Sequence, residues 1–317
     1  MSSGYTSMRP IRIGIIGFGK IARDQHVPSI ALHPCFELAA TVSRQGNGQP
    51  GVTCYTDHAS MLRDEKLDAV AICTPPTARY DIARDCVEAG LHCMLEKPPG
   101  VTLGEVEELA RLAGQRERSL FTTWHTQANP AVEAAADLLA GERIATMEVT
   151  WHEDVRKWHP GQTWIWEPGG FGVFDPGINA LSIVARIFPG ALFVREAELT
   201  YPANKQAPIA AELRFASPVS SGALTASFDF RYTQGEAWTI ELRTEAGRHL
   251  RLLDGGSRLE VDGAARATEG AGEYPALYGQ FLDLIDERRS HVDLRPLRLV
   301  ADALLVGRRV ETEPFED

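Results

Sequence analysis

The sequence offers little that would suit an extracellular, membrane or metal-binding protein. Its 317 residues include five cysteines, an odd number with no Cys-x-x-Cys pair, which argues against a disulfide framework or a zinc site. No run of eighteen apolar residues is present, although a membrane-spanning helix needs about that length. The first ten residues lack the apolar stretch of a secretory signal and are expected to form a short tail. We therefore expect a cytoplasmic protein with reduced cysteines, no membrane partner and no metal.

Basic residues are also in the minority. Lysine and arginine number 32 against 43 aspartate and glutamate residues, for a formal net charge of −11. Because basic surface drives binding to phosphate backbones, we expect no nucleic-acid partner. The remaining composition, 44% hydrophobic and 24% charged, is that of a globular chain long enough for two domains.

The sequence shows two different patterns of predicted secondary structure, one in each part of the chain. In the first part, short apolar runs alternate with helical stretches, which predicts parallel βαβ units. After about residue 141, short strands separated by turn residues predict an α+β domain with a large, mainly antiparallel open sheet, closed by helices over 274–289 and 296–310. We place the domains at 1–126 and 127–317.

A glycine-rich loop follows the first apolar run. Gly17-x-Gly19-x-x-Ala22 comes directly after a predicted strand and opens a helix, which is the context of a Rossmann dinucleotide-binding loop. Gly17 permits the tight turn, Gly19 lets the backbone approach a pyrophosphate, and Ala22 allows close packing. We therefore expect the first domain to bind NAD(P).

The end of the second predicted strand bears on which dinucleotide is bound. It reads Ser43-Arg44, where an NAD-preferring domain usually has an acidic residue for the ribose 2′-hydroxyl. Arg44 is suited to a 2′-phosphate, so we favour NADP, with NAD also accepted. The alternative is that Arg44 stacks on adenine or faces water. The expected cofactor-binding residues are Gly17, Phe18, Gly19, Lys20, Ile21, Ser43, Arg44, Thr74, Pro75, Glu96 and Lys97.

Three further residues suit proton transfer or orientation of a ligand. Lys97 ends a predicted buried strand, and ligands of open α/β sheets bind at such ends; the alternative is a solvated surface lysine. Asp175 and Asn179 follow a glycine-rich turn and are four residues apart, so that both lie on one face if a helix begins there. The alternative is that Asp175, which precedes Pro176, only caps that helix.

These motifs resemble a known family. Gly17-Phe18-Gly19 and Glu96-Lys97-Pro98, followed by an antiparallel sheet, are similar to the Gfo/Idh/MocA oxidoreductases. Residues 11–311, and above all the tryptophan-rich segment 156–184, resemble its bacterial L-arabinose and D-galactose 1-dehydrogenases. The resemblance implies oxidation of L-arabinose, D-galactose or D-fucose at C1 to the aldonolactone, with NAD(P)⁺ as hydride acceptor.

The resemblance also implies roles for single residues. Where the wider family has a histidine, this chain has Asn179, which cannot take up a proton at neutral pH. We therefore expect Lys97 and Asp175 to form the proton-accepting pair, with Asp175 the favoured base, and Asn179 to orient the sugar or the nicotinamide.

The segment 151–166 holds four of the six tryptophans, whose flat faces suit the C–H face of a pyranose. The expected substrate-binding residues are His125, Glu153, Trp158, His159, Asp175 and Asn179. We place His125 at the end of a strand. The alternatives are that tryptophans fill the core or a dimer interface, and that His125 caps a strand or faces water.

We expect a homodimer formed through the open sheet, because apolar positions in 223–230 and 238–242 suit pairing with a second copy. Two alternative functions remain at this point. The first is a dehydrogenase of the same family that acts on another sugar or polyol. The second is a non-catalytic sensor of a dinucleotide or sugar.

Overall fold

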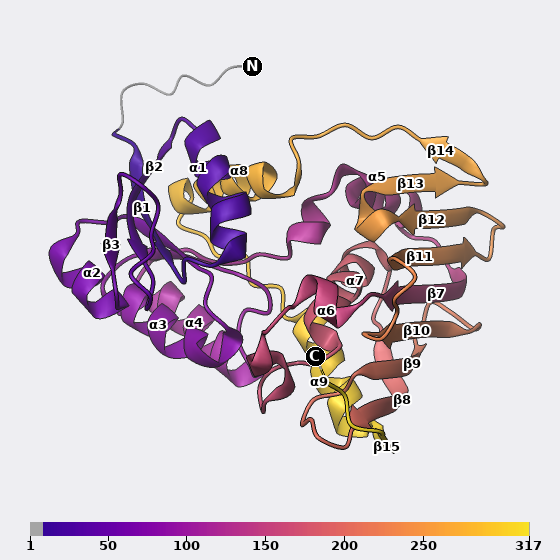
Figure 1. Ribbon diagram of the computed structural model, residues 1–317. Helices are drawn as coiled ribbons and strands as arrows, with labels where there is room; N and C mark the ends of the chain where they lie inside the picture. Colours follow the sequence, from indigo (N-terminus) through magenta and orange to yellow (C-terminus); the bar gives the residue numbers. More distant parts are fainter. Residues whose placement is uncertain (1–8, 317) are drawn as a thin grey trace, which may run out of the picture. The chain divides into compact units, whose positions relative to one another are not determined.

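The computed structural model describes residues 9–316, which divide into two compact units (Figure 1). The first unit runs to Gly100 and adds Gly104–Thr123 and Tyr274–Val292. The second holds Val101–Leu103, Trp124–Glu273 and the chain from Asp293 onward. Residues 274–292 thus pack with the first unit, although the predicted boundary places them in the second domain, 127–317. Residues 1–8 of the expected N-terminal tail lie outside the described residues. Within residues 9–316, no helix is both long and apolar enough to cross a membrane.

The first unit is built on a parallel sheet of six strands in the order β3-β2-β1-β4-β5-β6. Strands that are covered on both faces tend to be apolar, and β4 is buried along its whole length, whereas β1 is buried from Ile13 to Ile16. Figure 1 shows α3 and α4 on one face and α1 and α8 on the other. The strands are β1 (Ile11–Ile16), β2 (Phe36–Val42), β3 (Thr53–Tyr55), β4 (Ala69–Ile72), β5 (His92–Leu95) and β6 (Leu120–Thr122), and the helices are a π-helix (Ala22–His26), α1 (Val27–Leu32), α2 (His58–Asp64), α3 (Pro76–Glu88), α4 (Leu103–Gln115) and α8 (Glu273–Asp286).

The order of these strands fixes where a ligand would bind. The chain proceeds outward from β1 to β2 and β3, then returns to β4 on the other side of β1. Doubly wound sheets bind ligands at this reversal, outside the carboxyl ends of the strands. The prediction of a Rossmann-type parallel domain is confirmed.

The second unit carries a nine-stranded sheet in the order β14-β13-β12-β11-β7-β10-β9-β8-β15. Most neighbours are antiparallel, and the pairs β7–β10 and β8–β15 are parallel. Helices α5, α7 and α9 lie along one face (Figure 1). This confirms the prediction of a large, mainly antiparallel open sheet. The strands are β7 (Ile144–His152), β8 (Phe193–Pro202), β9 (Ala210–Ala216), β10 (Leu224–Asp229), β11 (Ala237–Thr244), β12 (His249–Leu253), β13 (Arg258–Val261), β14 (Ala264–Arg266) and β15 (Arg308–Thr312), and the main helices are α5 (Pro130–Leu139), α6 (Val155–Trp158), α7 (Phe174–Ile187) and α9 (Arg295–Val306).

Two sequence expectations about this sheet are wrong. The helix expected over 296–310 ends at Val306, because Gly307 adopts extended backbone (φ −70°, ψ 132°) and residues 308–312 join the sheet as β15. The apolar residues Leu224 and Phe228 are buried rather than open to a second copy. A Cβ placed on Gly177 of α7 would lie 2.7 Å from the Phe228 ring, which shows how closely α7 covers this strand.

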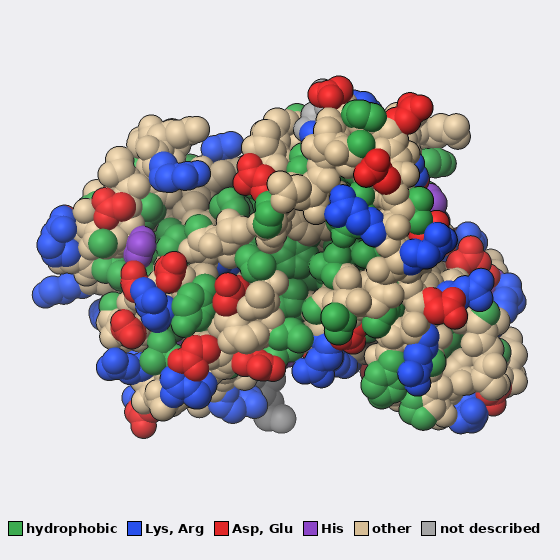
Figure 2. Space-filling model, turned by 90° about the horizontal axis from the view of Figure 1, so that it is seen from below, with side chains coloured by type: hydrophobic (Ala, Val, Ile, Leu, Met, Phe, Trp, Pro, Cys, Tyr) green, Lys and Arg blue, Asp and Glu red, His purple; other side chains and the backbone are tan. Residues whose placement is uncertain are grey.

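Charged side chains of both signs are interspersed on the face of the molecule seen in Figure 2. Many surface arginines pair with a carboxylate, as Arg143 does with Glu245 at 2.9 Å. Exposed pairs of this kind contribute at most about 1 kcal/mol each. The buried apolar layers, and not these pairs, are therefore the main source of stability.

One half-buried histidine gives the fold a specific acid sensitivity. His92, at the start of β5, accepts the Ser119 N–H with Nδ1 at 3.0 Å. Burial, together with the charge of Arg118, lowers the pKa of His92 to about 4 from 6.5. Because the folded pKa is depressed, the contribution of neutral His92 to stability is complete above pH 6.5 and is lost as the pH falls toward 4.

His92→Gln keeps an acceptor but cannot titrate. We expect the stability of this variant relative to wild type to rise by about 1–2 kcal/mol when the pH falls from neutral to about 4.5, after discounting for partial exposure. Urea unfolding at the two pH values measures this difference. Parallel pH dependences of the two proteins would show that His92 does not titrate in this window.

Candidate functional site

The glycine loop leaves the sheet at the strand-order reversal. Gly17 follows β1 with φ 91°, and a Cβ there would lie 2.7 Å from the Thr74 backbone nitrogen. Only glycine therefore fits without displacing the chain after β4. A Cβ placed on Gly19, in contrast, would meet no atom of residues 9–316 within 4 Å. The loop is thus fixed on one side and open on the other.

This loop fits a dinucleotide pyrophosphate. The open space at Gly19 admits a ligand close to the backbone, and the helical segment that begins after it supplies N–H groups. The hydroxyl of Thr74, after β4, is buried and has no hydrogen-bond partner among the described residues. An unpaired buried hydroxyl is costly, so it suits a ligand that approaches this edge.

Substitution at Gly19 separates ligand binding from folding. Gly19→Val is expected to weaken dinucleotide binding by about 100-fold, because the side chain occupies the open space, while the unfolding temperature of the free protein stays unchanged. Titration calorimetry with NADP and NAD, beside a thermal melt, measures both. Gly17→Ala is the contrasting variant and is expected to lower stability as well. Unaltered dinucleotide affinity in Gly19→Val would contradict the assignment.

The remaining residues expected at the cofactor are distributed around this edge. Phe18 is buried, Lys20 is exposed and pairs with Asp24, and the Ser43 hydroxyl donates to Asn47. Arg44, two residues beyond β2, is exposed and forms no hydrogen bond or ion pair with any described residue. Its guanidinium is therefore available to an anionic ligand.

Lys97 lies at the same edge of the first sheet. It follows β5, as Thr74 follows β4 and Gly17 follows β1, so that three adjacent strands bring these residues to one edge. Its side chain is half-buried, its backbone N–H donates to Glu96 Oε2 at 3.0 Å, and the peptide bond to Pro98 is cis. The placement is that of a residue facing the ligand crevice.

Asp175 lies in the first turn of α7. The N-cap of this helix is Val173, whose side chain forms no capping hydrogen bond with the described residues. The alternative that Asp175 serves as the N-cap is therefore wrong. Asp175 is 4% exposed. The preceding turn is tightly packed, since a Cβ on Gly170 would lie 1.9 Å from the Trp164 carbonyl oxygen. The glycine-rich segment thus brings the start of α7 against the tryptophan-rich segment.

Three of the expected substrate residues come together in the second unit. His159 Nε2 lies 3.7 Å from Glu153 Oε1, and its Nδ1 lies 3.7 Å from Asp175 Oδ2. Glu153 is 3% exposed and accepts a hydrogen bond from Trp238 Nε1 at 3.0 Å. Nδ1 of His159 is buried without a hydrogen-bond partner among the described residues. One imidazole between two buried carboxylates is suited to binding hydroxyl groups and to moving a proton.

Asn179 stands one turn after Asp175 and is half-buried on a helix whose neighbouring residues are buried. Its backbone carbonyl accepts from the Ser182 hydroxyl at 2.8 Å. Its side-chain amide forms no hydrogen bond within the part of the chain that the structure describes. This amide is therefore available to a ligand beside Asp175.

The tryptophans differ in how far they are buried. Trp151 and Trp166 are buried, whereas Trp158 is 42% exposed and donates from Nε1 to Glu236 at 3.0 Å. Trp158 lies 5.3 Å from Trp238 between ring centroids, and Trp238 stacks on Trp151 at 5.5 Å. The sequence did not single out Trp238, because its nearness to Glu153 depends on the pairing of β11 with β7.

His125 does not end a strand. Strand β6 stops at Thr122, and His125 begins a short 3₁₀ helix to Ala128. Its Nδ1 lies 2.9 Å from Glu273 Oε2. The role of His125 as a substrate-binding residue stays a prediction.

A doubly wound parallel sheet with this glycine loop, joined to a large open mixed sheet, defines an oxidoreductase of the two-domain, dinucleotide-binding class. Residues 11–123 match the model of the Gfo/Idh/MocA oxidoreductase family, described by its NAD-binding Rossmann fold. A galactose 1-dehydrogenase of Pseudomonas fluorescens is 46% identical over 312 residues, which cover 98% of this chain and all of that protein. The chain therefore belongs to the Gfo/Idh/MocA family.

Solved structures agree with this placement. The crystal structure of a D-galactose 1-dehydrogenase from Rhizobium etli superposes with a TM-score of 0.92 at 47% identity, covering 99% of this chain and all of that one. A 3-ketoreductase of Actinomadura kijaniata, solved with NADP and TDP-benzene, superposes with a TM-score of 0.80 at 18% identity over 96% of this chain and all of that one. The second likeness is one of fold alone.

Proposed function

We propose that this chain oxidises an aldose at C1 to the aldonolactone with NADP⁺, and accepts NAD⁺ as well. D-Galactose, L-arabinose and D-fucose are the proposed sugars. The observation that carries the proposal is the buried cluster of Glu153, His159 and Asp175. Beside it stands the amide of Asn179, which forms no hydrogen bond with a described residue. The two full-length relatives named as galactose 1-dehydrogenases support the same substrate class.

The reaction breaks two bonds to hydrogen. The C1–H bond gives up a hydride with its electron pair, O1 gives up its proton, and C1–O1 becomes the lactone carbonyl. The bound dinucleotide supplies the hydride acceptor. Asp175 takes the proton of O1, and the ammonium group of Lys97 stabilises that oxygen as it loses the proton. One aldose and one NADP⁺ thus give one lactone, one NADPH and one proton.

The other residues hold the sugar in position. Glu153 and His159 bind ring hydroxyls, the amide of Asn179 orients the reacting carbon, and the exposed face of Trp158 packs on the C–H face of the pyranose. Selectivity between the two dinucleotides rests on Arg44, whose guanidinium has no ion-pair partner among residues 9–316 and suits the 2′-phosphate of NADP⁺.

Absorbance at 340 nm tests this proposal with a panel of D-galactose, L-arabinose, D-fucose and D-glucose, each with NADP⁺ and with NAD⁺. Reduction with at least one of the first three sugars, faster with NADP⁺, is the expected result. In Arg44→Ala the preference for NADP⁺ is expected to fall while turnover with NAD⁺ persists. Absence of reduction with the entire panel, despite measured dinucleotide binding, would overturn the proposal in favour of another substrate or a sensor.

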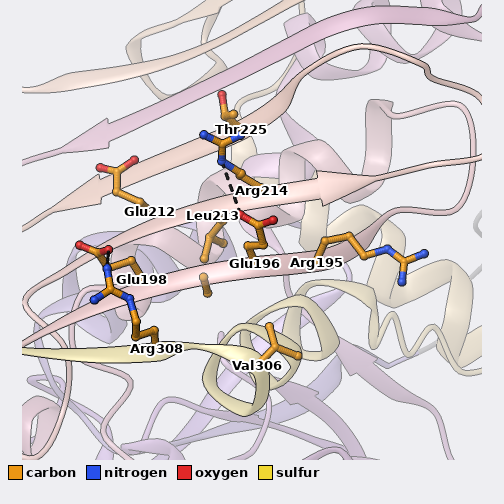
Figure 3. Close-up of a pocket in the computed structure, with 10 residues that line it drawn as sticks. Arg195, Glu196, Glu198, Glu212, Leu213, Arg214, Thr225, Val306 and Arg308 are labelled. Carbon is orange, nitrogen blue, oxygen red and sulfur yellow. Dashed lines mark hydrogen bonds and ion pairs between the residues drawn. The ribbon is translucent and has the colours of Figure 1, made fainter.

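We also propose that the chain acts as a homodimer through the open face of the second sheet. Figure 3 shows a pocket there whose charged side chains are of both signs. Glu196 lies 3.8 Å from Arg214, and Glu198 pairs with Arg308. A surface that carries both acidic and basic side chains can pair with the same surface of a second copy across a two-fold axis. Light scattering is expected to give twice the chain mass, and Arg214→Glu to shift the protein toward monomer; a monomeric wild type would refute this.

A further inference from the structure

The first unit holds a buried polar network that the proposed reaction does not use. His26 ends the π-helix after the glycine loop, and its side chain is completely buried. Its Nδ1 lies 2.9 Å from the Tyr278 hydroxyl, and its Nε2 lies 3.0 Å from Glu96 Oε1. The Tyr274 hydroxyl donates to the same oxygen of Glu96 at 2.9 Å. Side chains from the loop region and from α8 thus converge on one carboxylate.

Glu96 connects this network to Lys97. Its second oxygen, Oε2, accepts the backbone N–H of Lys97 at 3.0 Å. The buried guanidinium of Arg79 donates to the carbonyl of Glu96 at 2.5 Å and also to those of Pro98 and Thr74. The backbone on which the Lys97 side chain stands is therefore held by two independent groups.

The charges in this network hold the carboxylate of Glu96 in one orientation. Glu96 is almost completely buried, and a buried carboxylate is tolerated only where donors surround it. Burial by itself lowers the pKa of His26, but Cys73, Tyr278 and the hydrogen bond to Glu96 raise it well above its ordinary value. A cationic imidazole is the strongest available donor to this carboxylate.

We propose that His26 and Tyr274 are positioning residues for Lys97: they fix the carboxylate of Glu96, and through it the backbone that bears the Lys97 side chain. Without these two donors the carboxylate loses hydrogen bonds that set its orientation, and the hydrogen bond from the Lys97 N–H is held less firmly. Small displacements of a reacting group lower a rate far more than they lower binding. The inference rests on the proposed role of Lys97 in the reaction.

Four variants test this proposal. His26→Leu removes a donor to Glu96, His26→Gln restores a neutral donor at the place of Nε2, and Tyr274→Phe removes one hydroxyl with little change of shape. His92→Gln is the matched control, because His92 lies at the other end of β5 and bonds Ser119 instead. For each variant, kcat, the KM for the sugar and the dinucleotide Kd are measured, with a melt to verify folding.

A second readout does not depend on turnover. Reductive methylation of lysines with formaldehyde and cyanoborohydride, followed by peptide mass spectrometry across pH 7–10, reports the environment of Lys97 directly. The exposed Lys66 serves as internal reference in the same unit.

We expect kcat to fall about 10- to 100-fold in His26→Leu and about 3- to 10-fold in Tyr274→Phe, with KM and Kd changed less than about threefold. His26→Gln is expected to recover most of the loss, and methylation of Lys97 relative to Lys66 to change in the same order. Folded His26→Leu and Tyr274→Phe proteins with wild-type kcat and wild-type Lys97 labelling would overturn the proposal. If the wild-type protein turns over no sugar, the proposed function fails, and the labelling of Lys97 alone decides the positioning role.

Discussion

Asp175→Asn is expected to lower kcat by about 10²- to 10⁴-fold, the usual contribution of a positioned general base. Asparagine keeps the shape of the side chain in the first turn of α7 but cannot accept the proton of O1 at neutral pH. The dinucleotide Kd is expected to stay the same, because Asp175 belongs to the second unit and the glycine loop to the first. Steady-state kinetics at saturating sugar measures the loss.

Asp137→Asn is the control for this substitution. Asp137 is an exposed residue of α5 in the same unit, so its replacement removes the same charge without touching the cluster. Wild-type turnover is expected for this variant. A folded Asp175→Asn protein with wild-type kcat would exclude Asp175 as the proton acceptor.

Lys97→Met is expected to lower kcat by about 10²- to 10³-fold, because it removes the cation that stabilises O1 as the proton leaves. Methionine retains the length and apolar stem of the side chain, and Glu96 still accepts the backbone N–H at position 97. The fold is therefore expected to persist. The same substitution at the exposed Lys66 controls for loss of one positive charge.

The pH dependence of the residual rate distinguishes two roles of Lys97. If Lys97 shares the proton with Asp175, the apparent pKa values of the wild-type profile belong to the pair, and the profile changes shape in Lys97→Met. If Lys97 only holds the sugar oxygen, KM rises and the profile keeps its shape. A wild-type kcat and KM together would contradict both roles.

Much of the fold could be predicted from the sequence, because strands and helices are marked by local patterns of apolar residues and turn residues. The apolar residues 13–16 are followed directly by Gly17, and an apolar run that ends at glycine or proline is typical of a buried parallel strand. The expected helix over 296–310 failed at its end, because the turn at Gly307 depends on how closely the chain approaches Leu199 of β8. Such an approach between distant segments leaves no periodic pattern in the sequence.

The candidate site was accessible only in part. Gly17, Gly19 and Lys97 are marked by their position at strand ends, and Asp175 and Asn179 by their spacing on one helix. Trp238 and His26 were not found, since each acquires its partner through strand register or through helix α8, about 85 and 250 residues away in the chain. Their polar atoms form hydrogen bonds with residues far away in the chain, and no local sequence pattern predicts such pairs.

The most direct test of the proposed reaction is the fate of the hydrogen on C1. The protein is incubated with D-galactose or L-arabinose deuterated at C1 and with NADP⁺, and the reduced dinucleotide is analysed by mass spectrometry. One deuterium in each NADPH, with lactone as the sugar product, is the expected result. NADPH without deuterium, or a sugar oxidised at another carbon, would contradict oxidation at C1.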